Sequence, residues 1–276
     1  WSMVAIKMLG WLETLTHPDG CLVHFNDVAQ NHAPSASQLV KYAANLGISS
    51  ASAGQKQAQL IELSSTGFIR AKTERFDVMM NVGSVGPAYQ PGHAHADTLS
   101  FELSVDGLRW FVNTGVSGYG VTADRSYERS SEAHNTVVVD GMDSSEVWSS
   151  FRVARRARVR KLETKASRGR ISVHATHDGY TRLRSGPIHE RSWLVATDRM
   201  TIIDKVNNGS RPAFAHLLVR PGLDLEQVDD GKFVIRAPAG KQVVVEMAGG
   251  KLAESYYAPE FGIKTPTWKL TAPLQN

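Results

Sequence analysis

The feature that most constrains the fold is a succession of short alternating segments after residue 61. Apolar and polar residues alternate in these segments, which is typical of strands with one buried face. Turn signals such as Asp106-Gly107, Asp140-Gly141 and Pro221-Gly222 separate them. The candidate strands are 67–70, 76–82, 99–105, 108–113, 136–140, 154–162, 170–176, 188–195, 200–206, 213–219, 232–235 and 241–247. Because no helical periodicity intervenes, the pattern predicts a mainly β fold, an antiparallel β-sandwich.

The first 60 residues have a different pattern, so the predicted division is a helical segment with a linker, 1–60, and a sandwich, 61–276. The apolar residues at helical spacing in the first helix are Val4, Met8, Trp11, Leu12 and Leu15. A second helix is expected to begin after Ser35, with Gln38 as its capping-box partner, and to stop at Gly47. Its expected buried residues are Leu39, Tyr42, Ala43 and Leu46. Residues 49–60 are predicted to be the linker. Two helices cannot enclose a core, so we expect them to pack on the rest of the chain or on a preceding helical domain.

Composition excludes several classes of protein. Cys21 is the only cysteine of the 276 residues, which excludes an internal disulfide framework and a cysteine-rich zinc site. No apolar run reaches the roughly 20 residues that span a bilayer. The net charge of +4 suits an acidic ligand. The arginine-rich stretch 152–161 alternates with apolar residues, so we interpret it as the solvated face of a strand and predict no nucleic-acid partner.

The residues best suited to chemistry gather in Pro91-Gly92-His93-Ala94-His95-Ala96-Asp97. In an extended chain, His93, His95 and Asp97 would point the same way, at the head of the apolar row of strand 99–105. Unpaired buried polar groups are costly, so this cluster needs a metal, a substrate or a hydrogen-bond network as its partner. His134 precedes another short strand. Three imidazoles indicate a metal site or an acid–base site, and the alternative is a set of hydrogen-bonded core histidines.

Several blocks, taken in order along nearly the whole chain, resemble the heparinase II/III-like polysaccharide lyases. They are Phe25-Asn26-Asp27, Ala33-Pro34, residues 92–101, Val112-Asn113-Thr114-Gly115, residues 133–141 and His177-Asp178-Gly179-Tyr180. The greatest similarity is to the branch associated with bacterial surface-polysaccharide gene clusters. The resemblance implies the last helices of an α/α toroid followed by the C-terminal β-sandwich of that family.

This resemblance also implies eliminative cleavage of an acidic, uronate-containing polysaccharide. The uronate carboxylate is neutralised, a base removes the proton at C5, and an acid protonates the departing 4-oxygen. His93 matches the catalytic histidine of the sandwich, and Tyr119 lies where relatives place a tyrosine facing the cleft. The other catalytic groups of the family lie on the toroid, before Trp1, so we expect this chain to carry part of the active site and to need the missing toroid domain or chain as a partner. We expect a periplasmic or secreted location, and a cytoplasmic location is also compatible with the sequence.

By motif position, His95 and His134 match two ligands of a structural zinc ion. The third ligand of the family is commonly an aspartate, and Asn113 stands at that position here. An amide is an uncharged and poorer donor than a carboxylate. Three interpretations follow: Asn113 binds weakly through its oxygen, Asp97 substitutes for it, or the metal is lost and the side chains hydrogen-bond directly.

Arg125, Arg129 and His177 are predicted to bind the substrate. Either arginine can grip a uronate carboxylate through a bidentate fork, and His177 can line the same cleft. The alternatives are a solvated loop charge for Arg125, a strand cap for His177 and a loop-packing aromatic for Tyr119.

Two other functions compete with the lyase. One is a carbohydrate-binding or scaffold domain that has lost the lyase chemistry, which the amide of Asn113 motivates. The other is a metal-dependent oxygenase on a cupin-type barrel. A cupin needs a glutamate four or five residues after the second histidine, where Leu99 and Ser100 stand, so the sequence disfavours it.

Overall fold

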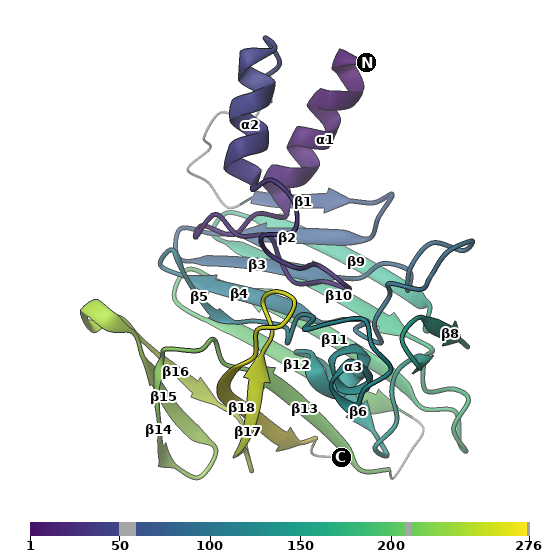
Figure 1. Cartoon of the computed structure of the whole chain (residues 1–276). Coiled ribbons are helices and arrows are strands. Elements are labelled where there is room, and N and C mark those ends of the chain that lie inside the picture. The colour runs from purple at the N-terminus through teal and green to yellow at the C-terminus, as the bar shows by residue number, and fades with distance from the viewer. Residues whose placement is uncertain (50–58, 208–210, 275–276) are drawn as a thin grey trace.

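The computed structural model describes residues 1–49, 59–207 and 211–274, and it is built mainly of antiparallel strands (Figure 1). This confirms the predicted fold class. Most of the predicted linker, residues 50–58, lies outside the described residues. The first strand begins at Gln59, one residue before the predicted end of that linker.

Two sheets of consecutive antiparallel strands form the body of the sandwich. The first has the order β1-β2-β3-β4-β5, with β1 (Gln59–Leu63), β2 (Phe68–Lys72), β3 (Phe76–Asn81), β4 (Phe101–Val105) and β5 (Leu108–Phe111). The second has the order β12-β11-β10-β9, with β9 (Val159–Ser167), β10 (Arg170–His177), β11 (Ile188–Val195) and β12 (Met200–Asn207). Figure 1 shows the second sheet behind the first.

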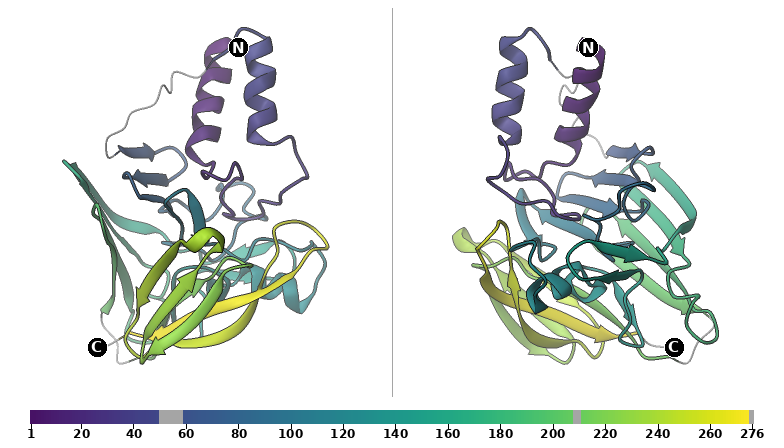
Figure 2. Two further views of the ribbon diagram at one scale, coloured as in Figure 1. Left: turned by 90° about the vertical axis from the view of Figure 1, so that its left-hand side faces the viewer. Right: turned by 45° about the vertical axis from the view of Figure 1, so that its right-hand side comes forward.

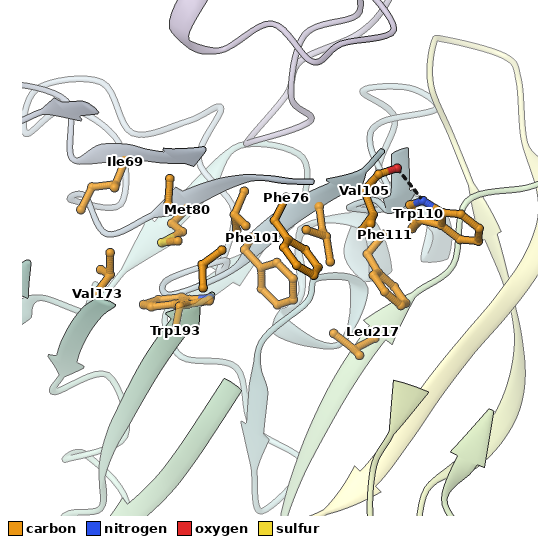
Figure 3. Packing of buried hydrophobic residues seen from close by; sticks show 14 of the residues in the cluster. Ile69, Phe76, Met80, Phe101, Val105, Trp110, Phe111, Val173, Trp193 and Leu217 are labelled. Carbon is orange, nitrogen blue, oxygen red and sulfur yellow. Dashed lines mark hydrogen bonds between the residues drawn. The ribbon is translucent and has the colours of Figure 1, made fainter. Parts of the chain in front are cut away.

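The core lies between these sheets (Figure 3). Met80 and Phe101 of the first sheet pack in one cluster with Val173 and Trp193 of the second. Trp193 is fully buried, and truncating a buried tryptophan costs about 3–5 kcal/mol. Phe101, Leu103 and Val105 alternate into this core, so the expected period-two pattern holds within β4.

Further strands extend the sandwich on one side. One sheet has the order β17-β18-β13-β6 and another has the order β14-β15-β16, while β7 and β8 form a hairpin. Their bounds are β6 (Val137–Val139), β7 (Glu146–Trp148), β8 (Arg152–Ala154), β13 (Ala213–Leu218), β14 (Asp224–Asp229), β15 (Lys232–Arg236), β16 (Gln242–Glu246), β17 (Lys251–Tyr257) and β18 (Thr265–Pro273). An antiparallel bridge from Phe111 to Val219 joins β5 to the end of β13. The strands that the sequence did not predict are β1, β7, β14, β17 and β18, and the predicted strand 154–162 is divided between β8 and β9.

Two helices, α1 (Ser2–Thr14) and α2 (Ala36–Asn45), stand above the sandwich next to β1 (Figures 1 and 2). The predicted capping box is confirmed, because the Ser35 hydroxyl accepts from Gln38 N while the Gln38 side chain accepts from Ser35 N. Gly47 follows the helix at φ 71°, as a C-terminal stop requires. The predicted buried residues are wrong for α2: Leu39, Tyr42 and Leu46 are exposed, and of the four only Ala43 is buried.

Candidate functional site

The segment from 91 to 100 is a loop, which corrects the expectation of a strand beginning at the histidines. β4 starts only at Phe101, because Leu99 has a left-handed φ of 61° that breaks the extended chain. The residues from Ala94 to Ser100 are buried, and Asp97 accepts from Asn81 Nδ2 at 2.9 Å instead of sharing a face with the histidines. His93 and His95 are therefore placed by side-chain partners and not by strand alternation.

Asp27 is the common partner of both histidines. Its Oδ1 accepts from His95 Nε2 at 2.8 Å, and its Oδ2 accepts from His93 Nδ1 at 2.9 Å. Arg125 donates to both carboxylate oxygens, with Nη2 to Oδ2 at 2.7 Å. Burial raises the pKa of Asp27, but the hydrogen bonds from His95 and Arg125 outweigh burial and hold that pKa well below its usual value. The sequence contained Asp27 in a block of the resemblance, but no spacing connected it with residues almost 70 positions away.

His93 is the exposed member of this network. Its side chain is 58% exposed, whereas that of Asp27 is 4% exposed. The rings of Tyr119 and Phe151 lie beside the imidazole, at centroid distances of 5.6 Å and 5.4 Å. The guanidinium of Arg125 lies over both aromatic rings, at 5.2 Å and 5.6 Å, so one arginine supports the carboxylate and the two rings that contact His93.

A cavity of about 300 Å³ opens beside His93, between the N-terminal segment and the sandwich. Its polar lining is His93, Tyr119, Asn26 and Asp27. The apolar lining comes from α1, from the chain that follows it and from β2, as Trp11, Leu15, Leu22, Val23, Phe25, Val28 and Phe68. Burial and the charge of Asp27 raise the pKa of Tyr119, so its phenol keeps its proton at neutral pH. The cavity therefore presents an imidazole and a protonated phenol next to an apolar wall.

His134, just before β6, meets His95 inside the protein. His95 Nδ1 and His134 Nε2 are 3.3 Å apart, and both side chains are buried. Two tetrahedral zinc ligands at the usual bond length lie about 3.3–3.4 Å from each other. The opposite nitrogen of His95 donates to Asp27, an arrangement typical of metal-binding histidines. Burial and the neighbouring His95 lower the pKa of His134 well below its usual value, so it offers a neutral nitrogen. The pair therefore fits two zinc ligands.

Asn113 fits the third ligand position less well. It is fully buried, its Oδ1 accepts from Asn135 N at 3.3 Å, and its Nδ2 has no hydrogen-bond partner among the described residues. It offers a metal at most the second lone pair of the amide oxygen. Across residues 1–49, 59–207 and 211–274, no three or more His, Cys, Asp and Glu side chains are grouped to hold a metal, which also leaves Asp97 without support as the third ligand.

The structure places Arg125, Arg129 and His177, the predicted substrate-binding residues, inside the protein. Helix α3 (Ala123–Arg129) presents both arginines on a buried face, and each is only 1% exposed. Arg125 is committed to Asp27 and to Ser150 O, and Arg129 donates to main-chain carbonyls that include Ala94 O at 3.0 Å. His177 is fully buried and pairs with His189 Nδ1 at 3.0 Å. Side chains without exposed donors cannot reach a glycan bound at the surface.

A buried polar layer beneath the site was also missed. The polar face of β4 is covered by the N-terminal segment, and Glu102 is fully buried there. It accepts from His17 Nε2 at 2.9 Å, from His24 N at 3.1 Å and from Asn113 N at 2.9 Å. Burial raises the pKa of Glu102, but His17 and the charge of Arg109 lower it overall to about 2. Through these bonds Glu102 connects the N-terminal segment, which carries Asp27, to β4, the strand that follows the histidine loop.

Comparisons with known proteins agree with this architecture. Residues 55–274 match the family described as heparinase II/III-like, C-terminal. Among solved structures, heparan sulfate lyase HepC from Pedobacter heparinus is similar with a TM-score of 0.70 and 17% identity, over 98% of this chain and 44% of that one. A structure described as heparinase III is similar with a TM-score of 0.76 and 13% identity, over 98% of this chain and 46% of that one. In the comparison with curated proteins, no sequence matches.

The chain thus spans less than half the length of the structures it resembles. Both of those structures carry names of glycan lyases or heparinases, and at these identities the likeness shows a shared fold. None of the helices in the described part of the chain is long and apolar enough to cross a membrane.

Proposed function

This chain belongs to the heparinase II/III-like family, and from that premise we propose that it is the C-terminal part of a polysaccharide lyase that cleaves an acidic, uronate-containing glycan by β-elimination. One observation carries the proposal: His93, the exposed end of a buried carboxylate–arginine network, lies on a cavity beside Tyr119. An exposed imidazole held by a buried carboxylate is the usual arrangement of a proton-transfer group.

In the proposed reaction, the neutral imidazole of His93 accepts the C5 proton of the uronate through Nε2. The electron pair of the C5–H bond forms the C4–C5 double bond, and the bond from C4 to the 4-oxygen breaks. Tyr119, whose raised pKa keeps its phenol protonated, donates its proton to the departing oxygen. Each proton transfer by a positioned group contributes roughly 10²–10⁴-fold to the rate.

Neutralisation of the uronate carboxylate needs a further group, since Arg125 and Arg129 are buried and occupied. We assign this role to a helical domain outside this chain, in agreement with the coverage of less than half of the similar structures. The exposed apolar side chains of α1 and α2 support such a partner, among them Met3, Met8, Tyr42 and Leu46. A periplasmic or secreted location, where acidic polysaccharides occur, agrees with this role.

We also propose that His95 and His134 hold a zinc ion, with the amide oxygen of Asn113 as a weak third ligand. Bound there, the ion would connect the loop before β4 to the segment before β6, and it would take no part in the elimination. His95 keeps its orientation through Asp27 in either case. The competing arrangement is a direct hydrogen bond between the two imidazoles, which the distance of 3.3 Å also allows.

The lyase proposal is tested by incubating the full-length protein with a panel of uronate polymers, including heparan sulfate, and following the ultraviolet absorbance of the unsaturated product. We expect product from at least one acidic glycan, and a loss of roughly 10²–10⁴-fold in kcat for His93→Ala. Glycan binding without product, unchanged by His93→Ala, would favour the second candidate function, a carbohydrate-binding or scaffold domain. The third ligand position occupied by an amide is the observation that keeps this candidate open.

A further inference from the structure

Asp27 is held in one place by its own local structure. The preceding Asn26 has a left-handed φ of 56°, which turns the chain at this point. Phe25, which is 2% exposed, stacks on Phe68 of β2 at a centroid distance of 5.3 Å and an interplanar angle of 4°. The turn is therefore anchored on the first sheet, and the carboxylate enters the site from the N-terminal segment with little freedom to move.

Within the described part of the chain, every hydrogen bond of the Asp27 carboxylate comes from a nitrogen donor. Its two oxygens receive the two terminal nitrogens of Arg125, Nε2 of His95 and Nδ1 of His93. An ionised carboxylate only accepts hydrogen bonds, and a guanidinium only donates them. Because Arg125 is always charged and is 1% exposed, the carboxylate beside it stays ionised. An imidazole nitrogen that faces this carboxylate must therefore carry a proton.

From this geometry we infer that Asp27 is a positioning residue, which holds His93 in the tautomer protonated at Nδ1 and leaves the lone pair on Nε2 for the cavity. The inference rests on the proposed catalytic role of His93 and adds the group that prepares it. Among the described residues, no hydrogen bond engages Nε2 of His93, so that nitrogen is free for a substrate.

The remaining contacts of His93 support the same assignment. Tyr119 and Phe151, which also contact each other, pack against the imidazole ring, but neither forms a hydrogen bond with it. With a side chain that is 58% exposed, an imidazole without Asp27 would be free to rotate and to carry its proton on either nitrogen. The hydrogen bond to Asp27 is the contact that distinguishes the two nitrogens of His93, so it determines which of them stays unprotonated.

The tautomer can be measured directly and without substrate. The full-length protein is labelled with ¹⁵N-histidine and studied by two-bond ¹H–¹⁵N correlation at a pH where His93 is neutral, with His93→Gln used to assign the signals. We expect the pattern of a protonated Nδ1 and an unprotonated Nε2. A pattern with Nε2 protonated, or an even mixture of tautomers, would overturn the inference in the wild-type protein itself, whether or not any variant folds.

Asp27→Asn then tests the dependence on the carboxylate. Its amide can donate or accept, so the His93 signals should move toward a mixture of tautomers, while those of His174, which bonds Ser192 away from the site, should stay unchanged. We expect kcat to fall by roughly 10²–10⁴-fold with KM within a few-fold, because Asp27 acts through His93. The matched control is Asp106→Asn, a carboxylate that also binds an arginine, Arg75 at 3.0 Å, but on the surface. It should leave kcat and the His93 signals unchanged.

The outcomes separate this inference from the proposed function. If no acidic glycan is cleaved but His93 is protonated at Nδ1, the positioning by Asp27 stands and the lyase proposal fails. If glycan is cleaved and Asp27→Asn folds with an unchanged His93 tautomer and an unchanged kcat, the inference fails and the lyase proposal stands.

Discussion

At the scale of single residues, burial decides what each histidine can do. His93 is exposed and open to a ligand, whereas His95, His134 and His177 are buried among named partners. The sequence brought the first three together as one constellation, and it could not separate exposed from buried members because side-chain spacing carries no information on what covers a loop. Which of these histidines is exposed and which are buried is therefore determined by the tertiary structure.

His216 on β13 illustrates how burial couples stability to pH. Burial and the charge of Lys269 lower the pKa of His216 to about 4, while the nearby Glu132 opposes this and Arg191 adds to it. The folded protein therefore binds fewer protons than the unfolded chain between about pH 6.5 and about pH 4. The stability that follows is complete above the unfolded pKa and is lost as the pH falls through this window.

The wild-type protein should lose unfolding free energy as the pH falls from about 7 to about 5. We expect this loss to be smaller by roughly 1–2 kcal/mol in His216→Gln. Urea unfolding at the two pH values measures this difference. His32→Gln, at an exposed position, is the control and should leave the loss unchanged. A loss in His216→Gln as large as in the wild-type protein would show that His216 titrates normally when folded.

Asn113 permits a second prediction at this scale. If His95 and His134 bind zinc, Asn113→Asp should raise the zinc affinity, because a carboxylate adds the charge that the amide lacks. We expect a gain of at least roughly tenfold, since even changes to groups that only hydrogen-bond the ligands have effects of that size. Metal analysis and competition with a chelator measure the change, and His134→Ala should abolish binding. Zinc absent from both the wild-type protein and Asn113→Asp would establish the direct imidazole pair instead.

At the scale of elements, Arg191 connects β11 to both histidine segments. Its guanidinium binds Asp204 of β12 through two nitrogens and also donates to Leu99 O at 2.8 Å and Asn135 O at 2.6 Å. Leu99 ends the loop that carries His93 and His95, and Asn135 follows His134. One arginine of the second sheet thus holds the two segments in place from below, a connection that no local pattern in the sequence indicates.

Arg191→Met should lower the unfolding free energy by roughly 3–5 kcal/mol, because it leaves the buried charge of Asp204 without its main partner. Denaturant unfolding measures the loss. The matched control Arg75→Met breaks an exposed pair with Asp106 and should cost about 1 kcal/mol or less. Similar losses for the two variants would mean that Arg191 contributes no more than a surface arginine.

At the scale of the whole molecule, the helices have a face that this chain does not cover. Val4 is 52% exposed, Met8 is 66% exposed and Trp11 is 38% exposed, although they lie at the spacing predicted for the buried face of α1. The helical pattern was right, but only the end of the apolar stripe packs on the sandwich, where Leu15 clusters with Met79 and the Trp11 ring contacts Phe68. In the proposed function, a helical domain outside this chain covers that face.

Because an exposed apolar face promotes association, we expect this chain by itself to self-associate in sedimentation experiments. Val4→Lys combined with Met8→Glu should reduce that association, with the melting temperature nearly unchanged. Leu9→Glu is the control, because Leu9 faces inward at 9% exposure and its change should lower the melting temperature. A large loss of melting temperature in the double variant would show that the stripe is packed within this chain.

The sequence by itself determined the antiparallel β architecture, most strand positions and the capping box of α2. These features depend on local periodicity and turn chemistry, which a few neighbouring residues specify. Three features were decided only by tertiary structure: the start of β4 at Phe101, the separate roles of His93 and His95, and the burial of Arg125, Arg129 and His177. Asp27 reaches the histidines across 66 and 68 positions, and a contact over that distance depends on how the whole chain packs, which no local pattern encodes.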